Sequence, residues 1–285
     1  MDLDLRKLRY FTAVAELRHF GRAAEQLYIA QPVLSRQIRA LENELGCALL
    51  TRTTRNVQLT AAGERLYQES RAVLATVDSA VRRVHEADRG VERLVVGFMP
   101  GLRISRAIRA FSAGRPNIEI DLVEMNWWEQ DAPLRDGRID VGCLRRPFDE
   151  GGLRVELVGS EPKVACLPAT HPLATKRTLN SADLAGESIM NAQTRRTSTV
   201  EEKFELIAAG RGVALVPESL ATTYSRPDIV YVAVLDAARV EICLAAADDR
   251  AEPRVLDFMT AAVAALGLEH ASARANTGDS SRLAV

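Results

Sequence analysis

The chain has 285 residues, 37 basic and 38 acidic side chains and a formal net charge of −1. This length accommodates one small and one larger domain, and the near-neutral charge gives no whole-chain indication of nucleic-acid binding. The sequence shows no N-terminal signal peptide and no long apolar run, so we expect a cytoplasmic protein without membrane contact.

The first 60 residues have a charge and helix pattern of their own. They carry nine basic and six acidic residues, a modest net charge of +3. Apolar spacing predicts a helix over residues 5–17, a short helix from residue 20, a turn around residues 29–30 and a helix within residues 30–46. Two short β-like runs on either side of residues 53–56 predict a hairpin. Three helices, a turn and a basic hairpin form the winged helix-turn-helix arrangement.

The predicted helix within residues 30–46 has one apolar face and one polar face. Leu34, Ile38, Leu41 and Leu45 form the expected buried stripe. Pro32 suits the first helical position, and Gly46 suits the C-terminal end. The opposite face is either a solvated surface or, given the preceding helix and turn, a surface that reads DNA bases and phosphates. The candidate DNA-binding residues are Gln31, Pro32, Ser35, Arg36 and Arg39 on this helix, with Arg52 and Arg55 on the hairpin.

Residues 5–64 resemble the DNA-binding domain of LysR-type transcriptional regulators. The resemblance rests on "LRYFTAVAE", "FGRAAEQL", "AQPVLSRQIRALENELG" and "LLTRTTRNVQLTAAGE", which occur in the family's order and spacing. Leu50 stands where the family usually has phenylalanine, and Cys47 is a second apolar departure. The resemblance implies a sequence-specific transcriptional regulator that binds a palindromic double-stranded site as a homodimer or homotetramer. RNA polymerase is a further candidate partner.

Residues 61–90 are predicted to form one long helix between Thr60, a candidate N-cap, and Gly90. Its apolar residues follow a coiled-coil-like spacing, and its length of roughly 45 Å exceeds what one small domain needs. We therefore expect a dimerisation helix, as in the resembled family; packing within its own domain is the alternative. The candidate dimerisation residues are Leu66, Val73, Val77 and Val84.

Residues 91–267 alternate predicted strands and helices. "RLVVGFM", "IEIDLVEM" and "IDVGCLR" are expected strands, with helices in "LRISRAIRAFSAG" and "WEQDAPLRDG" between them, which predicts a parallel sheet. A similar order recurs in "VEEKFELIAAG", "GVALVP", "ESLATTY" and "IVYVAVL". The segment resembles the two-lobed, periplasmic-binding-protein-like effector domain of the same family. The expected fold class is thus α+β with several domains. The remaining residues, 268–285, form a small, polar tail that we expect to be disordered.

Ligands of open α/β sheets bind at the carboxyl ends of strands. The candidate effector-binding residues there are Met99, Pro100, Gly101, Leu102, Asn126, Trp127, Thr197, Ser198, Thr199 and Pro217. Thr199 also fits a capping box with Glu202, and Trp127 is equally suited to a core. The stretch before residue 200 is shorter than the family's, which predicts a trimmed second lobe and a more open pocket.

Helix N-termini after Met99 and after Thr199 are expected to face the cleft and to favour an anion. Arg145, Arg146, Arg195 and Arg196 lie near strand ends on the same rim, where each is either a further positive charge or a solvated surface residue. We therefore expect a small organic acid as effector, aromatic if Trp127 contacts it.

The chain shows no phosphate loop, HExxH motif, nucleophile elbow or CxxC motif, and its four histidines are scattered. The absence of these motifs argues against one alternative function, that of an α/β enzyme that uses the DNA-binding domain for targeting. A second alternative is a structural nucleoid protein, but such a protein would not need the cleft domain. No metal or cofactor is expected. The four cysteines are predicted to be reduced and mostly buried: Cys47, Cys143, Cys166 and Cys243. The alternative is that two of them form a peroxide-sensing pair.

Overall fold

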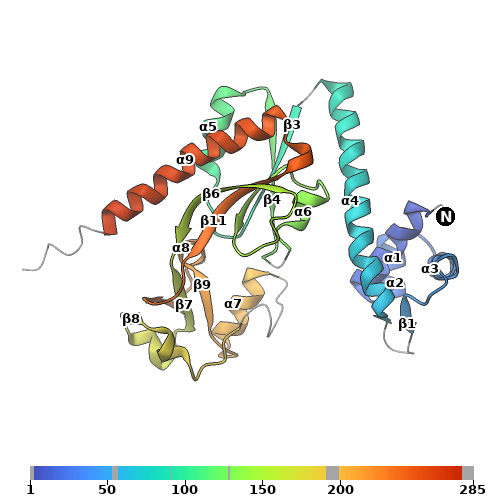
Figure 1. Cartoon of the computed structure of the whole chain (residues 1–285). Coiled ribbons are helices and arrows are strands. Elements are labelled where there is room, and N and C mark those ends of the chain that lie inside the picture. The colour runs from blue at the N-terminus through green and yellow to red at the C-terminus, as the bar shows by residue number, and fades with distance from the viewer. Residues whose placement is uncertain (1–2, 53–56, 91, 128, 191–198, 278–285) are drawn as a thin grey trace, which may run out of the picture. The chain divides into compact units, whose positions relative to one another are not determined.

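The structure is a computed structural model that describes residues 3–52, 57–90, 92–127, 129–190 and 199–277 (Figure 1). It divides into two compact units, one of residues 1–88 with 136–138 and one of residues 89–135 with 139–285. Each unit has its own core, so each is described by itself.

Three helices form the core of the first unit: α1 (Leu5–Leu17), α2 (Phe20–Gln26) and α3 (Gln31–Leu45). Asp4 caps α1 by accepting a hydrogen bond from the backbone N–H of Arg6 at 2.8 Å. Phe11, Leu34 and Ile38 are fully buried at the centre of this core. Small side chains at 23 and 24 are also buried, which allows the helices to approach closely. The three predicted helices are confirmed.

The hairpin follows α3 and leads into the longest helix. Strands β1 (Leu50–Arg52) and β2 (Val57–Leu59) pair antiparallel, as predicted, and residues 53–56 between them lie outside the described residues. Helix α4 (Ala61–Arg89) begins where the Thr60 hydroxyl accepts a hydrogen bond from Gly63 N at 3.0 Å. It ends at Gly90, whose φ of +63° suits glycine. The predicted N-cap and end of this helix are therefore confirmed.

The first lobe of the second unit is built on a five-stranded sheet with the order β4-β3-β5-β11-β6. The strands are β3 (Glu92–Phe98), β4 (Ile118–Glu124), β5 (Val141–Arg145), β6 (Leu153–Glu161) and β11 (Val240–Ala247). β3, β4 and β5 are parallel as predicted, but β11 is antiparallel to both β5 and β6. The sheet is mixed rather than purely parallel because β11 enters it from the other lobe.

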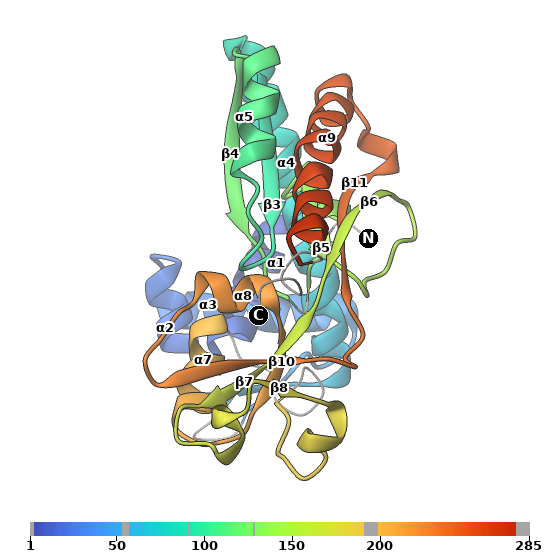
Figure 2. The same cartoon turned by 90° about the vertical axis from the view of Figure 1, so that its left-hand side faces the viewer.

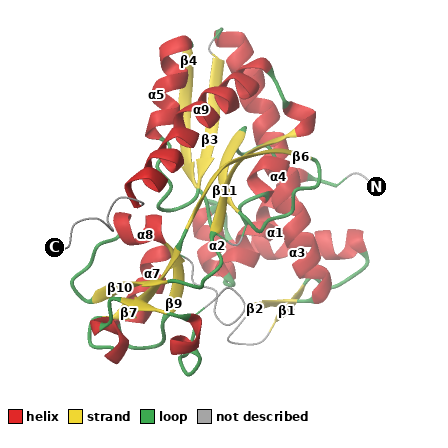
Figure 3. Ribbon diagram, turned by 60° about the vertical axis from the view of Figure 1, so that its left-hand side comes forward, coloured by secondary structure: helices red, strands yellow, loops and turns green. Residues whose placement is uncertain are grey.

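Two helices run alongside this sheet, α5 (Ser105–Gly114) and α9 (Pro253–Thr277) (Figure 3). Phe111 and Phe258 join them with an edge-to-face contact at a centroid distance of 5.3 Å. Among the described residues of "WEQDAPLRDG", 129–137, the helix covers only Ala132–Arg135 (α6), so the longer predicted helix is wrong. Helix α9 ends at Thr277, within the segment 268–285. Residues 278–285 lie outside the described residues, and the expected disorder of this tail stays a prediction.

The second lobe has a four-stranded sheet with the order β8-β10-β7-β9. Its strands are β7 (Lys163–Pro168), β8 (Thr178–Leu179), β9 (Ala214–Pro217) and β10 (Ile229–Val234), and its helices are α7 (Val200–Ala208) and α8 (Glu218–Thr223). Short 3₁₀ turns occur at Pro172–Thr175, Ser181–Leu184 and Asp248–Arg250. Here β7 lies between β9 and β10 and is antiparallel to both, so the second lobe is not a repeat of the parallel first lobe.

Two strand connections join the lobes. Only Pro162 separates β6 from β7, and residues 235–239 lead from β10 back to β11 (Figure 2). Residues 162–239 therefore form the second lobe as one continuous insertion into the first.

Candidate functional site

The amino-terminal part of α3 presents a polar surface. Gln31, Pro32, Arg36 and Arg39 are exposed and Ser35 is partly buried, while the opposite face packs into the core. Among the described residues, neither arginine has a hydrogen-bond or ion-pair partner. This surface therefore offers amide, hydroxyl and guanidinium groups of the kind that bind base edges and phosphates.

A residue that the sequence pattern did not indicate precedes this surface. Tyr28 is 95% exposed and has a φ of +54°, which is uncommon for a bulky residue. In the sequence it lies between Leu27 and Ile29 and gives no sign of exposure. The side chain of Arg52 and all of Arg55 lie outside the described residues, so their predicted role stays a prediction.

One face of α4 carries exposed valines. Val73 is 44% exposed and Val84 is 67% exposed, whereas Val77 and Leu66 are partly buried. Val81, 50% exposed, extends this face and was missed because it departs from the seven-residue spacing. At 100° per residue these side chains share one side of the helix, so an apolar stripe faces solvent in the single chain.

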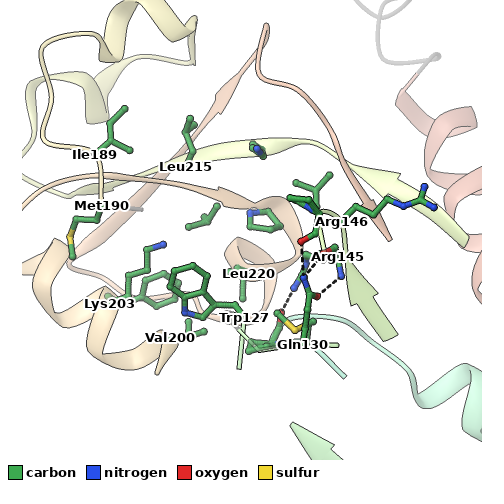
Figure 4. A pocket seen from close by; sticks show the side chains of 18 residues that line it. Trp127, Gln130, Arg145, Arg146, Ile189, Met190, Val200, Lys203, Leu215 and Leu220 are labelled. Atoms are coloured by element: carbon green, nitrogen blue, oxygen red, sulfur yellow. Dashed lines mark hydrogen bonds between the residues drawn. The ribbon is translucent and has the colours of Figure 1, made fainter. Parts of the chain in front are cut away.

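A cavity of about 530 Å³ lies between the two lobes of the second unit (Figure 4). The first lobe contributes the ends of β3 and β5 and the segment around Trp127, and the second lobe contributes α7, β9 and the start of α8. The volume falls in the range of small-molecule pockets. Apolar side chains dominate its wall, among them Met99, Met190, Phe204, Leu215 and Leu220.

One residue of the cavity wall, Arg145, belongs to a buried ion pair. Nε of Arg145 donates to Oε1 of Glu161 at 2.8 Å, and each side chain is only 8% exposed. The remaining guanidinium nitrogens donate to the Pro100 carbonyl at 2.9 Å and to the Ser219 hydroxyl at 2.6 Å. Glu161 Oε2 in turn accepts the backbone N–H of Ser219 at 2.8 Å. The group thereby links β5, the end of β6 and the first turn of α8, and Arg145 is not a solvated surface residue.

The charges of the cavity wall are not equally compensated. Arg146 donates to Glu150 at 2.6 Å and to Glu241 at 2.7 Å, so its charge is neutralised. Lys203 on α7 has no ion-pair partner among the described residues, and its Nζ lies 5.4 Å from the Trp127 ring centroid. Burial lowers the pKa of this ammonium, because desolvation disfavours its charged form.

The predicted effector residues are only partly brought together. Met99, Pro100, Trp127 and Pro217 line the cavity. Leu102 is buried in the core of the first lobe, and Asn126 and Gly101 are absent from the described cavity wall. Thr197 and Ser198, with Arg195 and Arg196, lie outside the described residues.

The two helix N-termini that were expected to face the cavity contribute less to its wall than predicted. Thr199 caps α7 by accepting the Glu202 N–H at 3.1 Å, which supports its capping role. Helix α5 starts only at Ser105, because Leu102 and Ile104 turn into the core first, and no α5 residue lines the described cavity wall. The sequence also missed Gln130 and Lys203; Gln130 exchanges two hydrogen bonds with the backbone of Arg145, at 2.6 and 2.9 Å.

The described part of the chain gives little indication of metal binding or of cysteine redox chemistry. No group of three or more histidine, cysteine, aspartate or glutamate residues there could hold a metal ion. All four cysteines are free; Cys143, Cys166 and Cys243 are buried, and Cys47 is exposed. Burial raises the pKa of the Cys143 and Cys166 thiols to about 12. Within the described residues, no helix is long and apolar enough to span a membrane.

Comparison with known proteins agrees with both units. Residues 5–64 match the family of bacterial regulatory helix-turn-helix proteins of the lysR family, and residues 85–267 match the LysR substrate binding domain. The chain is 43% identical over 194 residues to the HTH-type transcriptional regulator YnfL of Escherichia coli K12, covering 66% of this chain and 65% of that protein. It is 35% identical over 270 residues to CatR of Pseudomonas putida, covering 84% of this chain and 90% of that protein.

A solved structure is similar over nearly the whole length of the chain. Full-length CbnR in complex with its target DNA has a TM-score of 0.51 and 25% identity, covering 93% of this chain and 100% of that one. A winged helix-turn-helix unit joined to a two-lobed ligand-binding unit defines a DNA-binding transcriptional regulator with an effector domain. The chain belongs to the LysR family of these regulators. It is not an enzyme.

Proposed function

We propose that this regulator binds a palindromic DNA site as a homodimer or homotetramer and responds to an organic acid held between its effector lobes. The observation that carries the effector half of the proposal is the apolar interlobe cavity, with a lysine that has no carboxylate partner among the described residues. We place this activity in the cytoplasm, where the DNA is accessible, with RNA polymerase as a candidate partner.

Base recognition is assigned to Gln31, Pro32, Ser35 and Arg36, and phosphate contacts to Arg39 with Arg52 and Arg55. The support is the exposure of the α3 surface and the absence of internal partners for Arg36 and Arg39 among the described residues. An unpaired guanidinium can approach a guanine without first breaking an internal ion pair.

Dimerisation is assigned to α4. Its support is the stripe of exposed valines, because burial of such a stripe against a second copy removes apolar surface from water. Two copies related by a two-fold axis would read two half-sites in opposite orientation. The effector would then act by shifting the relative population of two such arrangements.

The experiment is in vitro selection of randomised DNA with the purified full chain, followed by affinity measurement on the enriched site. We expect an inverted repeat. Arg36→Ala should weaken specific binding by about 1–3 kcal/mol and leave random DNA little affected. Arg109→Ala, which removes an exposed arginine of α5 in the other unit, is the matched control. Equal loss on both DNAs would make Arg36 a phosphate contact, and no loss on either would refute the assignment of α3.

A further inference from the structure

The wall of the interlobe cavity contains four basic side chains, and two of them already have carboxylate partners. Arg145 is paired with Glu161, and Arg146 with Glu150 and Glu241. The two lysines, Lys163 at the start of β7 and Lys203 on α7, have no ion pair among the described residues. Burial lowers the pKa of Lys203, because desolvation disfavours its charged form.

The surroundings of Lys203 do not compensate its charge. Its amine lies over the Trp127 ring, and Val200 and Phe204 flank it along α7 and also line the cavity (Figure 4). An ionisable group that influences it is the Cys166 thiol, which burial keeps protonated and neutral. A cation beside an aromatic face gains some electrostatic stabilisation, but less than it loses in desolvation when no anion is present.

We propose that Lys203 binds a single carboxylate of the effector. The apolar body of the effector packs on Trp127 and fills the space bounded by Met190 and Leu220. The inference rests on the proposed function, namely that the interlobe cavity is the effector site. The ligand class is a monocarboxylic acid with a flat or branched apolar body. Lys203 supplies the anion specificity that helix N-termini were expected to provide.

This role of Lys203 has opposite consequences for the stability of the free protein and for ligand affinity. In the ligand-free protein the unpaired ammonium is unfavourable, so Lys203→Met should raise the melting temperature of the free full-length chain. In the complex the same ammonium forms a charge-assisted hydrogen bond to the carboxylate, so the variant should lose ligand affinity. A lysine with only a packing role would lower the melting temperature when replaced.

The test is a thermal-shift and calorimetric screen of the full chain with hexanoate, octanoate, benzoate, phenylacetate and cinnamate, each beside its neutral primary amide. We expect at least one acid, and not its amide, to stabilise the wild type. Lys203→Met should weaken that acid by roughly tenfold to a hundredfold, and Lys203→Arg should retain most of the binding. Lys176→Met, the same charge change at an exposed lysine outside the cavity wall, should leave binding unchanged.

A cavity-filling variant, Leu215→Trp, separates the role of the cavity from the role of Lys203. If a compound loses binding in Leu215→Trp but binds equally well to Lys203→Met, the cavity is the effector site and the anchor assignment is wrong. The anchor assignment is also wrong if only the neutral amides bind. If no acid or amide gives a shift that Leu215→Trp abolishes, the proposed effector site itself is overturned.

Discussion

The Arg145–Glu161 pair provides the sharpest test of the energetics of the effector domain. In Glu161→Gln the side chain keeps its shape but has one oxygen where it had two. That oxygen can accept either from Arg145 Nε, now 2.8 Å away, or from Ser219 N, also 2.8 Å away. The amide nitrogen must then face the other donor. The variant therefore loses the ion pair and places two donors against each other.

The magnitude follows from burial. Both side chains are 8% exposed, so water cannot replace the lost partner, and breaking such a pair costs about 3–5 kcal/mol. A domain of this size has a free energy of unfolding of about 5–15 kcal/mol, so the loss is a large share of the total. The control is Glu119→Gln. Glu119 pairs with Arg93 at 3.2 Å but is 59% exposed, and its loss should cost less than about 1 kcal/mol.

Urea unfolding followed by tryptophan fluorescence measures this difference directly. Both tryptophans of the chain, Trp127 and Trp128, belong to the second unit, so the signal reports unfolding of the effector domain. If Glu161→Gln lowers the free energy of unfolding by no more than Glu119→Gln does, water reaches the pair in solution and burial does not set its energy.

Three further predictions concern other parts of the chain. Native protein should react with a thiol reagent at one site, the exposed Cys47, and unfolded protein at all four; a second fast-reacting thiol would contradict the burial of the others. Val73→Asp combined with Val77→Asp should give monomers in sedimentation experiments and weak binding to a palindromic site, and a normal dimer would show that α4 packs within one chain. Gly101→Ala should lower stability to urea by about 1–3 kcal/mol, because φ is +82° and the new Cβ would lie 3.1 Å from Leu220 N. An unchanged urea midpoint would mean that the lobes separate easily there.

The DNA-binding unit could be predicted from sequence because its signals are local. The spacing of Leu34 and Ile38, the glycine at 46 and the cap at Thr60 each fix a helix face or end without reference to distant residues. The mixed sheets could not be predicted in the same way. The position of β11 depends on where the chain returns from the second lobe, which no periodicity within "VEICLAAA" records.

Prediction of the site residues from sequence is limited in the same way, because some of them depend on contacts with distant parts of the chain. Lys203 follows two glutamates in "VEEKFEL" and resembles a residue on a solvated helix face until the first lobe brings Trp127 against it. Arg145 resembles a surface arginine at a strand end, because Glu161 and Ser219 are far along the chain. Met99, Pro100 and Pro217 were found because strand ends are the places where open sheets bind ligands.

The continuous insertion of the second lobe has an evolutionary consequence. The lobe begins after Glu161 and ends before Val240, and these two residues are cross-strand neighbours in the β6–β11 ladder. A gene fragment for residues 162–239 from a related regulator could therefore be exchanged by two crossovers whose ends meet at adjacent positions in the fold. Such an exchange would replace the cavity wall that carries Lys203 and keep the wall that carries Trp127. Effector choice could thus diverge by recombination of one segment while operator recognition is inherited unchanged.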